Sequence, residues 1–472
     1  MTVSVGDCIL TIIIGKTEYI YYIFIGKAER DDKMFKRKIE KTLMNYYNNS
    51  NDKIIIIDGA RQIGKSYIIR NTASKYFNNY VEIDLKSDYE GEKLFENVKT
   101  TKAFYLLVGS LYGNKLNTLE DTIIFLDEIQ FYPHLITMLK DLKKEAKYRY
   151  IASGSLLGVT LKHSFIPMGS IDKIKMYPMD FEEFLWANNV SNESIDYLRN
   201  CFEKRSKIED AIHQTFLSLF KDYLICGGLP DAVTEYVLNR NVIKTRNVHT
   251  QTFTYYKDDC SKYDIDHKLK ISKLYDLMIS NMVNKVKRII FKKIENKEDN
   301  NLEKYEEEFD YLCASGVANS AHAVSNPIFP LNESTSKNLV KLYYNDVGIL
   351  TNLLYRNNIS AILGSTDKGI NLGSVYETVC AMELKAHGHE LYYFDSKKVG
   401  EVDFLINDYN NLCVLPIEIK SGKDQNNFRA IPKLVSKDGN YKLPYGYVFG
   451  NKNIVEEKDG LITLPIYLIM FV

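Results

Sequence analysis

Short apolar runs alternate with stretches of helical pattern along the chain from Asp52 onward. The runs are almost continuously apolar, which is typical of strands that are buried on both faces of a sheet. Because such strands alternate with helices, the pattern predicts an α/β fold with a parallel sheet wrapped by helices. The expected strands are KIIIID (53–58), YVEIDL (80–85), TIIFLDE (122–128), YRYIASGS (148–155) and IDKIKMYP (171–178).

The pattern becomes helical after these strands, and it stays helical and charged from about 250 to 350, with a solvated run at 292–309. A last section, from about Gly373, shows a helix, about three strands and several turn residues. The length of 472 residues exceeds that of one ordinary domain. We therefore expect three domains, at 34–205, 206–350 and 351–472.

Residues 1–33 differ from the rest of the chain. Their apolar runs, CILTIII and YIYYIFIG, are separated by GKTE, so neither reaches the ~18 residues that a membrane span needs. The basic n-region and small-residue cleavage site of a signal peptide are also missing from them. Since MFKRKIEKTL from Met34 resembles a natural protein start, we expect residues 1–33 to be an upstream extension or a small hairpin, with no membrane anchor.

Composition narrows the class of protein. The chain has 61 Lys and Arg residues and 61 Asp and Glu residues, so no global field favours a nucleic-acid or membrane partner. Its seven cysteines are widely scattered, and no CxxC pair occurs. This spacing suggests neither a zinc site nor a disulfide framework, and it fits a reducing cytoplasm.

A phosphate-binding motif follows the first expected strand. GARQIGKS satisfies the pattern G-x-x-x-x-G-K-[ST] between a strand and a helix, which is the context that the motif requires. Backbone N–H groups of such a loop surround phosphate oxygens, and the helix N-terminus adds a favourable dipole. Lys65 is expected to reach the β- and γ-phosphates of ATP, and Ser66 to bind Mg²⁺. The predicted nucleotide-binding residues of this loop are Gly59, Ala60, Arg61, Gln62, Ile63, Gly64, Lys65 and Ser66.

Two adjacent acids end the third expected strand, in TIIFLDEIQ. Asp127 fits the carboxylate that holds Mg²⁺ at a strand end, and Glu128 is placed to orient or deprotonate the attacking water. The strand YVEIDL lies between the two motifs, as in P-loop ATPases that hydrolyse ATP with a glutamate. The next strand ends in ASGS, where Ser153 or Ser155 is expected beside the γ-phosphate; a plain turn at the strand end is the alternative.

Carboxylates and a lysine also recur near the C-terminus, in VGEVDFLINDYNNLCVLPIEIKSGK (399–423). Asp403 lies in one apolar run, and Glu418 and Lys420 lie in the next. Since side chains alternate along a strand, Glu418 and Lys420 share one face. These residues fit either a metal site or a surface ion pair.

The chain resembles the AAA-type ATPases of bacteria and archaea that carry a C-terminal domain of unknown function 4143. The resemblance spans roughly 34–425 and rests on motifs in the family's order: GARQIGKS, FLDEIQ, ASGSLLG, PMGSIDKIKMYPMDFEEFLWA, YLICGGLPDAV, KLYYNDVGILTNLL, GSVYETVCAMEL and GEVDFLI…IEIKSGK. It implies a P-loop ATPase with a helical lid, a winged-helix-like middle and a restriction-endonuclease-like C-terminal domain. Relatives often have Arg or Lys where this chain has Ser170, so the resemblance locates no arginine finger here.

The resemblance also bears on the C-terminal carboxylates. In restriction-endonuclease-like cores, a helix glutamate, a strand aspartate and an E-x-K pair bind Mg²⁺ and activate water. The matching residues are Glu377, Asp403, Glu418 and Lys420, of which Glu377, Asp403 and Glu418 would be the metal ligands. Such cores also occur as binding modules without cleavage, so both roles stay open.

Three weaker features complete the set. His387 and His389, in AHGH, fit a helix-to-strand turn better than a metal site. The basic stretch NKVKRIIFKK, at 284–293, fits nucleic-acid phosphates or a solvated helix face equally well. Asp346, in YYNDVG, is expected to cap a turn.

Together these features predict a cytoplasmic ATPase that uses ATP and Mg²⁺ and is coupled to a nuclease-like domain that binds or acts on DNA or RNA. The alternatives are an ATP-gated binding switch without nuclease activity and an adaptor that acts on another protein. We expect no membrane partner, and homo-oligomer formation is left open.

Overall fold

The computed structural model describes residues 2–5, 8–11, 35–49, 53–155, 157, 169–263, 268–283, 302–363, 372–421, 429–436, 439 and 441–472. Residues 1–36 and 37–472 form two separate compact units. In the first unit, strands β1 (Thr2–Val5) and β2 (Cys8–Thr11) pair antiparallel. The basic stretch at 284–293 lies outside the described residues, and so do most of residues 1–33.

The second unit begins with a five-stranded sheet whose order is β4-β5-β6-β3-β7, and every neighbouring pair in it is parallel. This confirms the predicted α/β fold with a parallel sheet. Each strand starts and ends within a few residues of its predicted position. The strands are β3 (Ile54–Asp58), β4 (Asn79–Asp84), β5 (Thr122–Asp127), β6 (Arg149–Gly154) and β7 (Ile171–Lys175).

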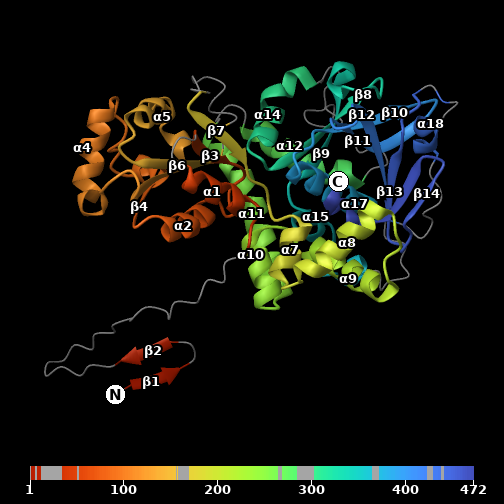
Figure 1. Cartoon of the computed structure of the whole chain (residues 1–472), viewed down its shortest axis with the longest axis horizontal. Coiled ribbons are helices and arrows are strands. Elements are labelled where there is room, and N and C mark those ends of the chain that lie inside the picture. Colours follow the sequence, from red (N-terminus) through yellow and green to blue (C-terminus); the bar gives the residue numbers. More distant parts are fainter. Residues whose placement is uncertain are drawn as a thin grey trace. The chain divides into compact units, whose positions relative to one another are not determined.

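Helices lie on both sides of this sheet, with α5 on one side and α1 and α2 on the other (Figure 1). The α-helices are α1 (Ile39–Asn48), α2 (Lys65–Tyr76), α3 (Leu85–Glu90), α4 (Thr101–Tyr112) and α5 (Pro133–Glu145). Two short 3-10 helices, η1 (Gly113–Lys115) and η2 (Ile129–Phe131), join them.

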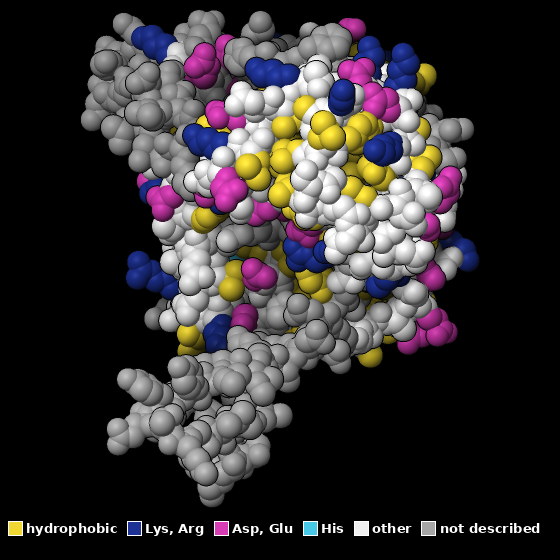
Figure 2. Space-filling view, turned by 90° about the vertical axis from the view of Figure 1, so that its left-hand side faces the viewer, with side chains coloured by type: hydrophobic (Ala, Val, Ile, Leu, Met, Phe, Trp, Pro, Cys, Tyr) yellow, Lys and Arg dark blue, Asp and Glu magenta, His cyan; other side chains and the backbone are white. Residues whose placement is uncertain are grey.

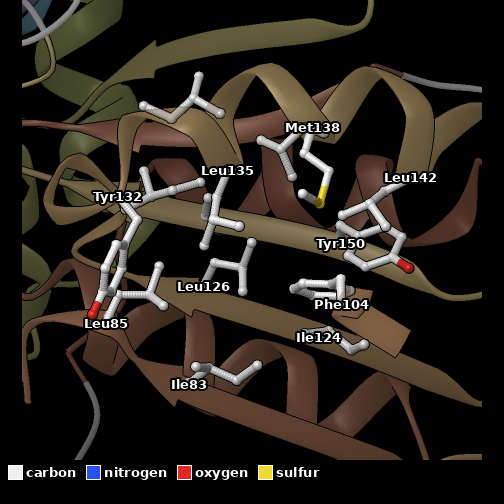
Figure 3. Close-up of a cluster of buried hydrophobic side chains, with 14 of the residues drawn as sticks. Ile83, Leu85, Phe104, Ile124, Leu126, Tyr132, Leu135, Met138, Leu142 and Tyr150 are labelled. Atoms are coloured by element: carbon white, nitrogen blue, oxygen red, sulfur yellow. The ribbon is translucent and has the colours of Figure 1, made fainter. Parts of the chain in front are cut away.

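The apolar runs of the strands form the core of this domain. Figure 3 shows Ile124 and Leu126 of β5 among Leu135 and Leu142 of α5 and Phe104 of α4. All five side chains are buried. Full burial of a side chain of this size stabilises a fold by about 1.5–3 kcal/mol relative to its exposure. The end of β5, where the two acids of the LDE motif follow, is therefore anchored in a packed core.

Helix α4 has an apolar outer face as well as a buried one. Phe104 and Val108 point into the core, whereas Leu106 and Leu111 are 64% and 45% exposed. Figure 2 views the side of the molecule on which α4 lies, and hydrophobic side chains gather there between charged ones.

A helical region follows the sheet, as predicted. Its α-helices are α7 (Phe181–Ala187), α8 (Asn192–Lys204), α9 (Asp210–Cys226), α10 (Pro230–Val233), α11 (Val242–Tyr263), α12 (Lys268–Val283) and α14 (Glu306–Ala314). A π-helical turn, η4 (Thr234–Leu238), and a 3-10 turn, η5 (Leu302–Tyr305), complete the region. No helix in the described ranges is both long and apolar enough to cross a lipid bilayer.

The C-terminal part is an eight-stranded mixed sheet of order β14-β15-β13-β12-β11-β10-β8-β9. Its strands are β8 (Ala318–Val324), β9 (Thr335–Tyr344), β10 (Leu391–Ser396), β11 (Gly400–Asp408), β12 (Cys413–Lys420), β13 (Gly446–Gly450), β14 (Glu456–Lys458) and β15 (Leu461–Pro465). Its helices are α15 (Val347–Tyr355), α16 (Ser360–Leu363), α17 (Gly373–Ala386) and α18 (Ile431–Val435), with 3-10 helices η6 (Leu331–Ser334) and η7 (Ile466–Phe471).

Two expectations for this part of the chain are wrong. The stretch from 250 to 350 is not helical throughout, because β8 and β9 lie within it and join the C-terminal sheet. Strand β8, ANSAHAV, is rich in the helix former Ala, and its parallel pairing with β10 overrides that preference. The last section also has six strands, β10 to β15, where about three were expected. Strand β14, EEK, is wholly exposed and has no apolar residue to indicate it.

Asp346 was predicted to cap a turn. In the structure it is the N-cap residue of helix α15. Its side chain accepts hydrogen bonds from the backbone N–H of Ile349 at 3.0 Å and from that of Gly228 at 2.6 Å. The carboxyl group is fully buried, and burial raises its pKa to about 6. Asp346 thus joins α15 to the turn that follows α9.

We predict that Gly227→Ala destabilises the protein. Gly227 has a φ of +67°, and a Cβ there would lie 2.2 Å from Oδ1 of Asp346. We expect a loss of about 2 kcal/mol or more, from left-handed strain and from displacement of the carboxylate. Urea denaturation measures this loss. The control is Gly109→Ala in helix α4, where a Cβ would meet nothing within 4 Å and where Ala stabilises a helix by about 0.5–1 kcal/mol. Equal stability of Gly227→Ala and wild type would contradict the account.

Candidate active site

The P-loop connects the buried strand β3 to helix α2, at the edge of the sheet where the parallel strands end. Gly64 is the N-cap of α2, with a left-handed φ of 91°. Hydrogen bonds from outside the loop hold it in place, and one of them runs from the hydroxyl of Tyr256 to the carbonyl oxygen of Arg61 at 2.8 Å. Arg37 donates to the carbonyl oxygen of Ile63 at 3.0 Å, and Thr252 of α11 donates to Oε1 of Gln62 at 2.8 Å.

Lys65 is buried inside the loop that precedes it. Its Nζ donates to the carbonyl oxygens of Gly59 at 2.9 Å and Ala60 at 2.8 Å. Burial lowers the pKa of Lys65, while the carboxylates of Glu128 and Asp127 act in the opposite direction. The loop therefore presents an ammonium group and a helix N-terminus to the same space, and this combination suits an anion.

Asp127 lies at the end of β5, where it meets two hydroxyl groups. Ser66 donates to its Oδ2 at 2.7 Å, and Ser153, at the end of β6, donates to its Oδ1. Burial raises the pKa of Asp127, whereas the two serine hydrogen bonds lower it. The structure thus brings together the three residues for which the sequence predicts Mg²⁺ or nucleotide contacts. A hydroxyl beside a carboxylate is a donor set that suits Mg²⁺, a hard, oxygen-seeking ion.

Glu128 is oriented by two hydrogen bonds and one ion pair, all at the same carboxylate oxygen, Oε2. Its backbone has a left-handed φ of 53°. Ser155 donates to Oε2 at 3.0 Å, the amide of Gln130 also donates to it, and Nη2 of Arg61 lies 3.7 Å from it. Because all these contacts are with Oε2, the orientation of the carboxylate is strongly constrained.

Arg61 connects this glutamate to helix α11. Its Nε donates to Ser155 at 3.0 Å, and its Nη1 donates to the hydroxyl of Tyr255 at 2.6 Å and lies 2.9 Å from Oδ1 of Asp259. Burial acts to lower the pKa of Arg61, but the charges of Glu128 and Asp259 raise it overall. A guanidinium held by carboxylates on both sides links the P-loop to the helical region.

Several of these contacts were not expected from the sequence. Gln130 lies within the motif FLDEIQ, close to Glu128 in sequence, so the contact between them could have been predicted. Arg37, Tyr255 and Asp259 are far from the P-loop in sequence, and none lies in a motif that would indicate the contact. Arg37 also forms an ion pair with Glu183 at 3.0 Å, which fixes it beside the loop.

The C-terminal carboxylates lie on the neighbouring antiparallel strands β11 and β12. Oδ2 of Asp403 accepts a hydrogen bond from the backbone N–H of Ile419 at 2.8 Å, so Asp403 stands beside Glu418. Nζ of Lys420 donates to Oε1 of Glu418 at 2.7 Å. Burial raises the pKa of Glu418; Lys420 lowers it, and Glu377 raises it further.

Glu377 is buried on α17, and the hydroxyl of Tyr343 donates to its Oε2 at 3.4 Å. Within the described ranges, however, no three His, Cys, Asp or Glu side chains are grouped closely enough to hold a metal ion. The predicted residues are therefore neighbours without forming a closed ligand set.

The two histidines of AHGH follow helix α17. His387 is the C-cap residue of α17, and its Nδ1 lies 3.0 Å from the carbonyl oxygen of Val472. Its Nε2 lies 3.7 Å from Asp180, and this carboxylate contributes to a raised pKa of His387. The position at the end of a helix agrees with the predicted turn.

Three family models match successive parts of the chain. An AAA domain covers residues 51–185, domain of unknown function 8612 covers 217–360, and domain of unknown function 4143 covers 372–469. An uncharacterized protein of Methanocaldococcus jannaschii is 27% identical over 244 residues, which are 49% of this chain and 49% of the relative. The chain thus spans about half the length of this curated relative.

Solved structures are similar at lower identity. The Walker-type ATPase of Pyrococcus abyssi is 15% identical, with a TM-score of 0.40, over 69% of this chain and 97% of that one. The Holliday junction branch migration motor RuvB of Thermotoga maritima is 12% identical, with a TM-score of 0.29, over 60% and 89% of the two chains. From the matched families, the chain carries an AAA-type P-loop ATPase domain at 51–185 and a C-terminal domain of unknown function 4143 at 372–469.

Proposed function

We propose that this chain binds Mg²⁺·ATP at the P-loop and hydrolyses it with Glu128 as the general base. The observation that carries the proposal is the Glu128 carboxylate beside Asp127 and the P-loop. Its Oε2 accepts hydrogen bonds from Ser155 and Gln130 and lies 3.7 Å from Nη2 of Arg61. A carboxylate fixed in this way can accept a proton from an attacking water without a prior rotation of its side chain. The supporting family evidence is the AAA domain at 51–185.

The residues of the site have distinct roles in this proposal. Backbone N–H groups of the loop from Gly59 to Ser66 bind the phosphates, and Lys65 neutralises the charge of the β- and γ-phosphates. Ser66 and Asp127 would hold Mg²⁺, which would neutralise charge on the phosphate oxygens. Ser153 donates to Asp127 and holds its carboxylate in position. Glu128 accepts the proton of the attacking water.

The proposal predicts that ATP turnover depends on a divalent ion. Removing Mg²⁺ with EDTA should abolish phosphate release, because Ser66 and Asp127 would no longer hold the ion against the phosphates. Adding back Mg²⁺ or Mn²⁺ should restore it. A colorimetric phosphate assay on the full chain measures both steps. Turnover that persists in EDTA would argue against the proposed use of these two residues.

We further propose that Arg61 is a positioning residue for Glu128. Arg61→Met should lower kcat by about one to two orders of magnitude with little change in KM, since the arginine contacts the base and not the nucleotide in this account. Arg61→Lys, which keeps a positive charge at this position, should recover part of the lost kcat.

The matched control is Arg70→Met, in helix α2, which removes an exposed arginine that pairs with Glu82 at 2.6 Å. This variant should turn over ATP like wild type. If Arg61→Met raised KM as much as it lowered kcat, or if Arg61→Lys recovered no activity, Arg61 would not be a positioning residue for Glu128.

Cleavage of nucleic acid by the C-terminal domain is a second candidate function. The observation that favours it is the pairing of Glu418 with Lys420 beside Asp403, in the E-x-K arrangement that the resemblance to restriction-endonuclease-like cores implies. In this candidate, Glu377, Asp403 and Glu418 would bind a divalent ion and Lys420 would stabilise developing charge. Incubation of the full chain with DNA and with RNA, with Mg²⁺ or Mn²⁺ and with or without ATP, tests it. The rival without cleavage is an ATP-gated binding switch.

A further inference from the structure

One side of helix α11 lies against the P-loop. The residues of α11 that contact Arg61 or Gln62 are Thr252, Tyr255, Tyr256 and Asp259. Pairs of them are three or four positions apart, which places them on the same side of the helix. The P-loop lies in the segment that matches the AAA domain, whereas α11 lies in the segment that matches domain of unknown function 8612. A second family domain therefore borders the candidate active site.

Asp259 of α11 and Glu128 lie at two ends of the same guanidinium. Nη1 of Arg61 lies 2.9 Å from Oδ1 of Asp259, and Nη2 of Arg61 lies 3.7 Å from Oε2 of Glu128. Arg61 and Asp259 are 7% and 8% exposed, so salt screens their ion pair only weakly. Because a guanidinium is planar and rigid, holding one end fixes the direction of the other. The position of Asp259 thus sets where Arg61 meets Glu128.

Helix α11 also contacts the loop residues next to the catalytic groups. The hydroxyl of Tyr256 donates to the carbonyl oxygen of Arg61, and that of Thr252 donates to the side chain of Gln62, both at 2.8 Å. Gln62 has a left-handed φ of 64°, which a residue other than glycine keeps only when its surroundings hold it. These contacts tie the shape of the loop to the position of α11.

The first half of α11 is fixed to helix α15 (Val347–Tyr355). The buried Arg246 donates to the hydroxyl of Thr351 at 2.9 Å, and the amide of Asn352 donates to the hydroxyl of Thr250 at 2.9 Å. Since one continuous helix carries these contacts and those with the P-loop, it connects α15 to the candidate active site.

We propose that helix α11 controls the rate of ATP hydrolysis, with Asp259 as the positioning residue that keeps Arg61 against Glu128. This inference rests on the proposed ATP hydrolysis and names the part of the chain that regulates it. While α11 is in place, Arg61 is fixed and helps to orient the base. A shift of α11 releases Arg61, so Glu128 loses one of the contacts that orient it and turnover falls.

Steady-state phosphate release by the full chain with Mg²⁺·ATP tests the proposal. Asp259→Asn should lower kcat about tenfold with KM within about twofold of wild type, because a neutral amide no longer pairs with the guanidinium. In an Arg61→Met chain, the same substitution should change kcat by less than about twofold, since no guanidinium is left to position. A general loss of stability would instead lower kcat in both backgrounds.

The matched control is Asp258→Asn, which removes the same charge from an exposed position one residue away on α11. It should turn over ATP like wild type. An equal loss of kcat in Asp258→Asn would overturn the inference. An unchanged kcat in Asp259→Asn, or a tenfold loss that persisted in the Arg61→Met chain, would overturn it too.

Hydrogen exchange of the nucleotide-free full chain gives a second readout that needs no turnover. Backbone amides of residues 252–259 should exchange at least about threefold faster in Asp259→Asn than in wild type or Asp258→Asn, because this part of α11 loses a contact. Unchanged exchange in Asp259→Asn would contradict the role of Asp259 whatever the turnover. Wild type that hydrolysed no ATP while Asp259→Asn exchanged faster would instead contradict the ATPase proposal, so the two failures are distinguishable.

Discussion

Lys65→Ala is expected to weaken ATP binding by about two orders of magnitude, since each charge-assisted hydrogen bond contributes about 1.5–3 kcal/mol and 1.4 kcal/mol is a tenfold change in affinity. The ammonium of Lys65 lies inside the P-loop, bound to the carbonyl oxygens of Gly59 and Ala60. In the proposed complex it exchanges these carbonyl oxygens for phosphate oxygens, which carry full negative charge. Isothermal titration calorimetry with Mg²⁺·ATP measures the loss.

The control for this variant is Lys75→Ala. Lys75 lies in the last turn of the same helix, α2, and is exposed. The two variants remove the same charge from the same helix, so a general electrostatic effect would appear in both. If Lys65→Ala and wild type bound ATP with equal affinity, the P-loop assignment would be wrong.

Glu128→Gln is expected to bind Mg²⁺·ATP like wild type but to hydrolyse it about 10²–10⁴ times more slowly, which is the usual contribution of a general base. A glutamine has nearly the same shape, and its amide oxygen can still accept from Ser155. It cannot take up the proton of the attacking water. We therefore expect a loss in kcat without a matching change in ATP affinity.

Glu120→Gln is the matched control. Glu120 is exposed and lies just before β5, so this variant makes the same chemical change outside the site. Steady-state phosphate release with both variants and wild type gives the comparison. Full turnover in Glu128→Gln would assign the base to another residue.

The first sheet was predictable because its strands are buried on both faces. Ile54, Ile55, Ile56 and Ile57 of β3 are all buried, and such a run has few other stable arrangements. The contact of Ser66 with Asp127 was predictable from the motif at the end of β3 and the acids at the end of β5. Local pattern and tertiary structure agree in this part of the chain.

The C-terminal domain was harder to predict, because distant segments form its sheet. Strand β8 pairs with β10 across more than one intervening helix. Lys341, on the neighbouring strand β9, forms an ion pair with Glu401 of β11, which comes much later in the sequence. Lys341 is one of two lysines in KNLVKLYY, and from the sequence alone it looks like a surface residue. Only the pairing of the strands shows that Lys341 is buried and paired with Glu401. The same reason explains why the contacts of Arg61 with Tyr255 and Asp259 could not be foreseen.

The most direct test of the central claim is a single-turnover measurement with Mg²⁺ and radiolabelled ATP, in which bound nucleotide and released phosphate are followed together. We predict that wild type converts its bound ATP to ADP and phosphate, while Glu128→Gln binds as much ATP and retains it intact over the same time. Wild type that bound ATP without releasing phosphate, or Glu128→Gln that released phosphate at the wild-type rate, would contradict the account.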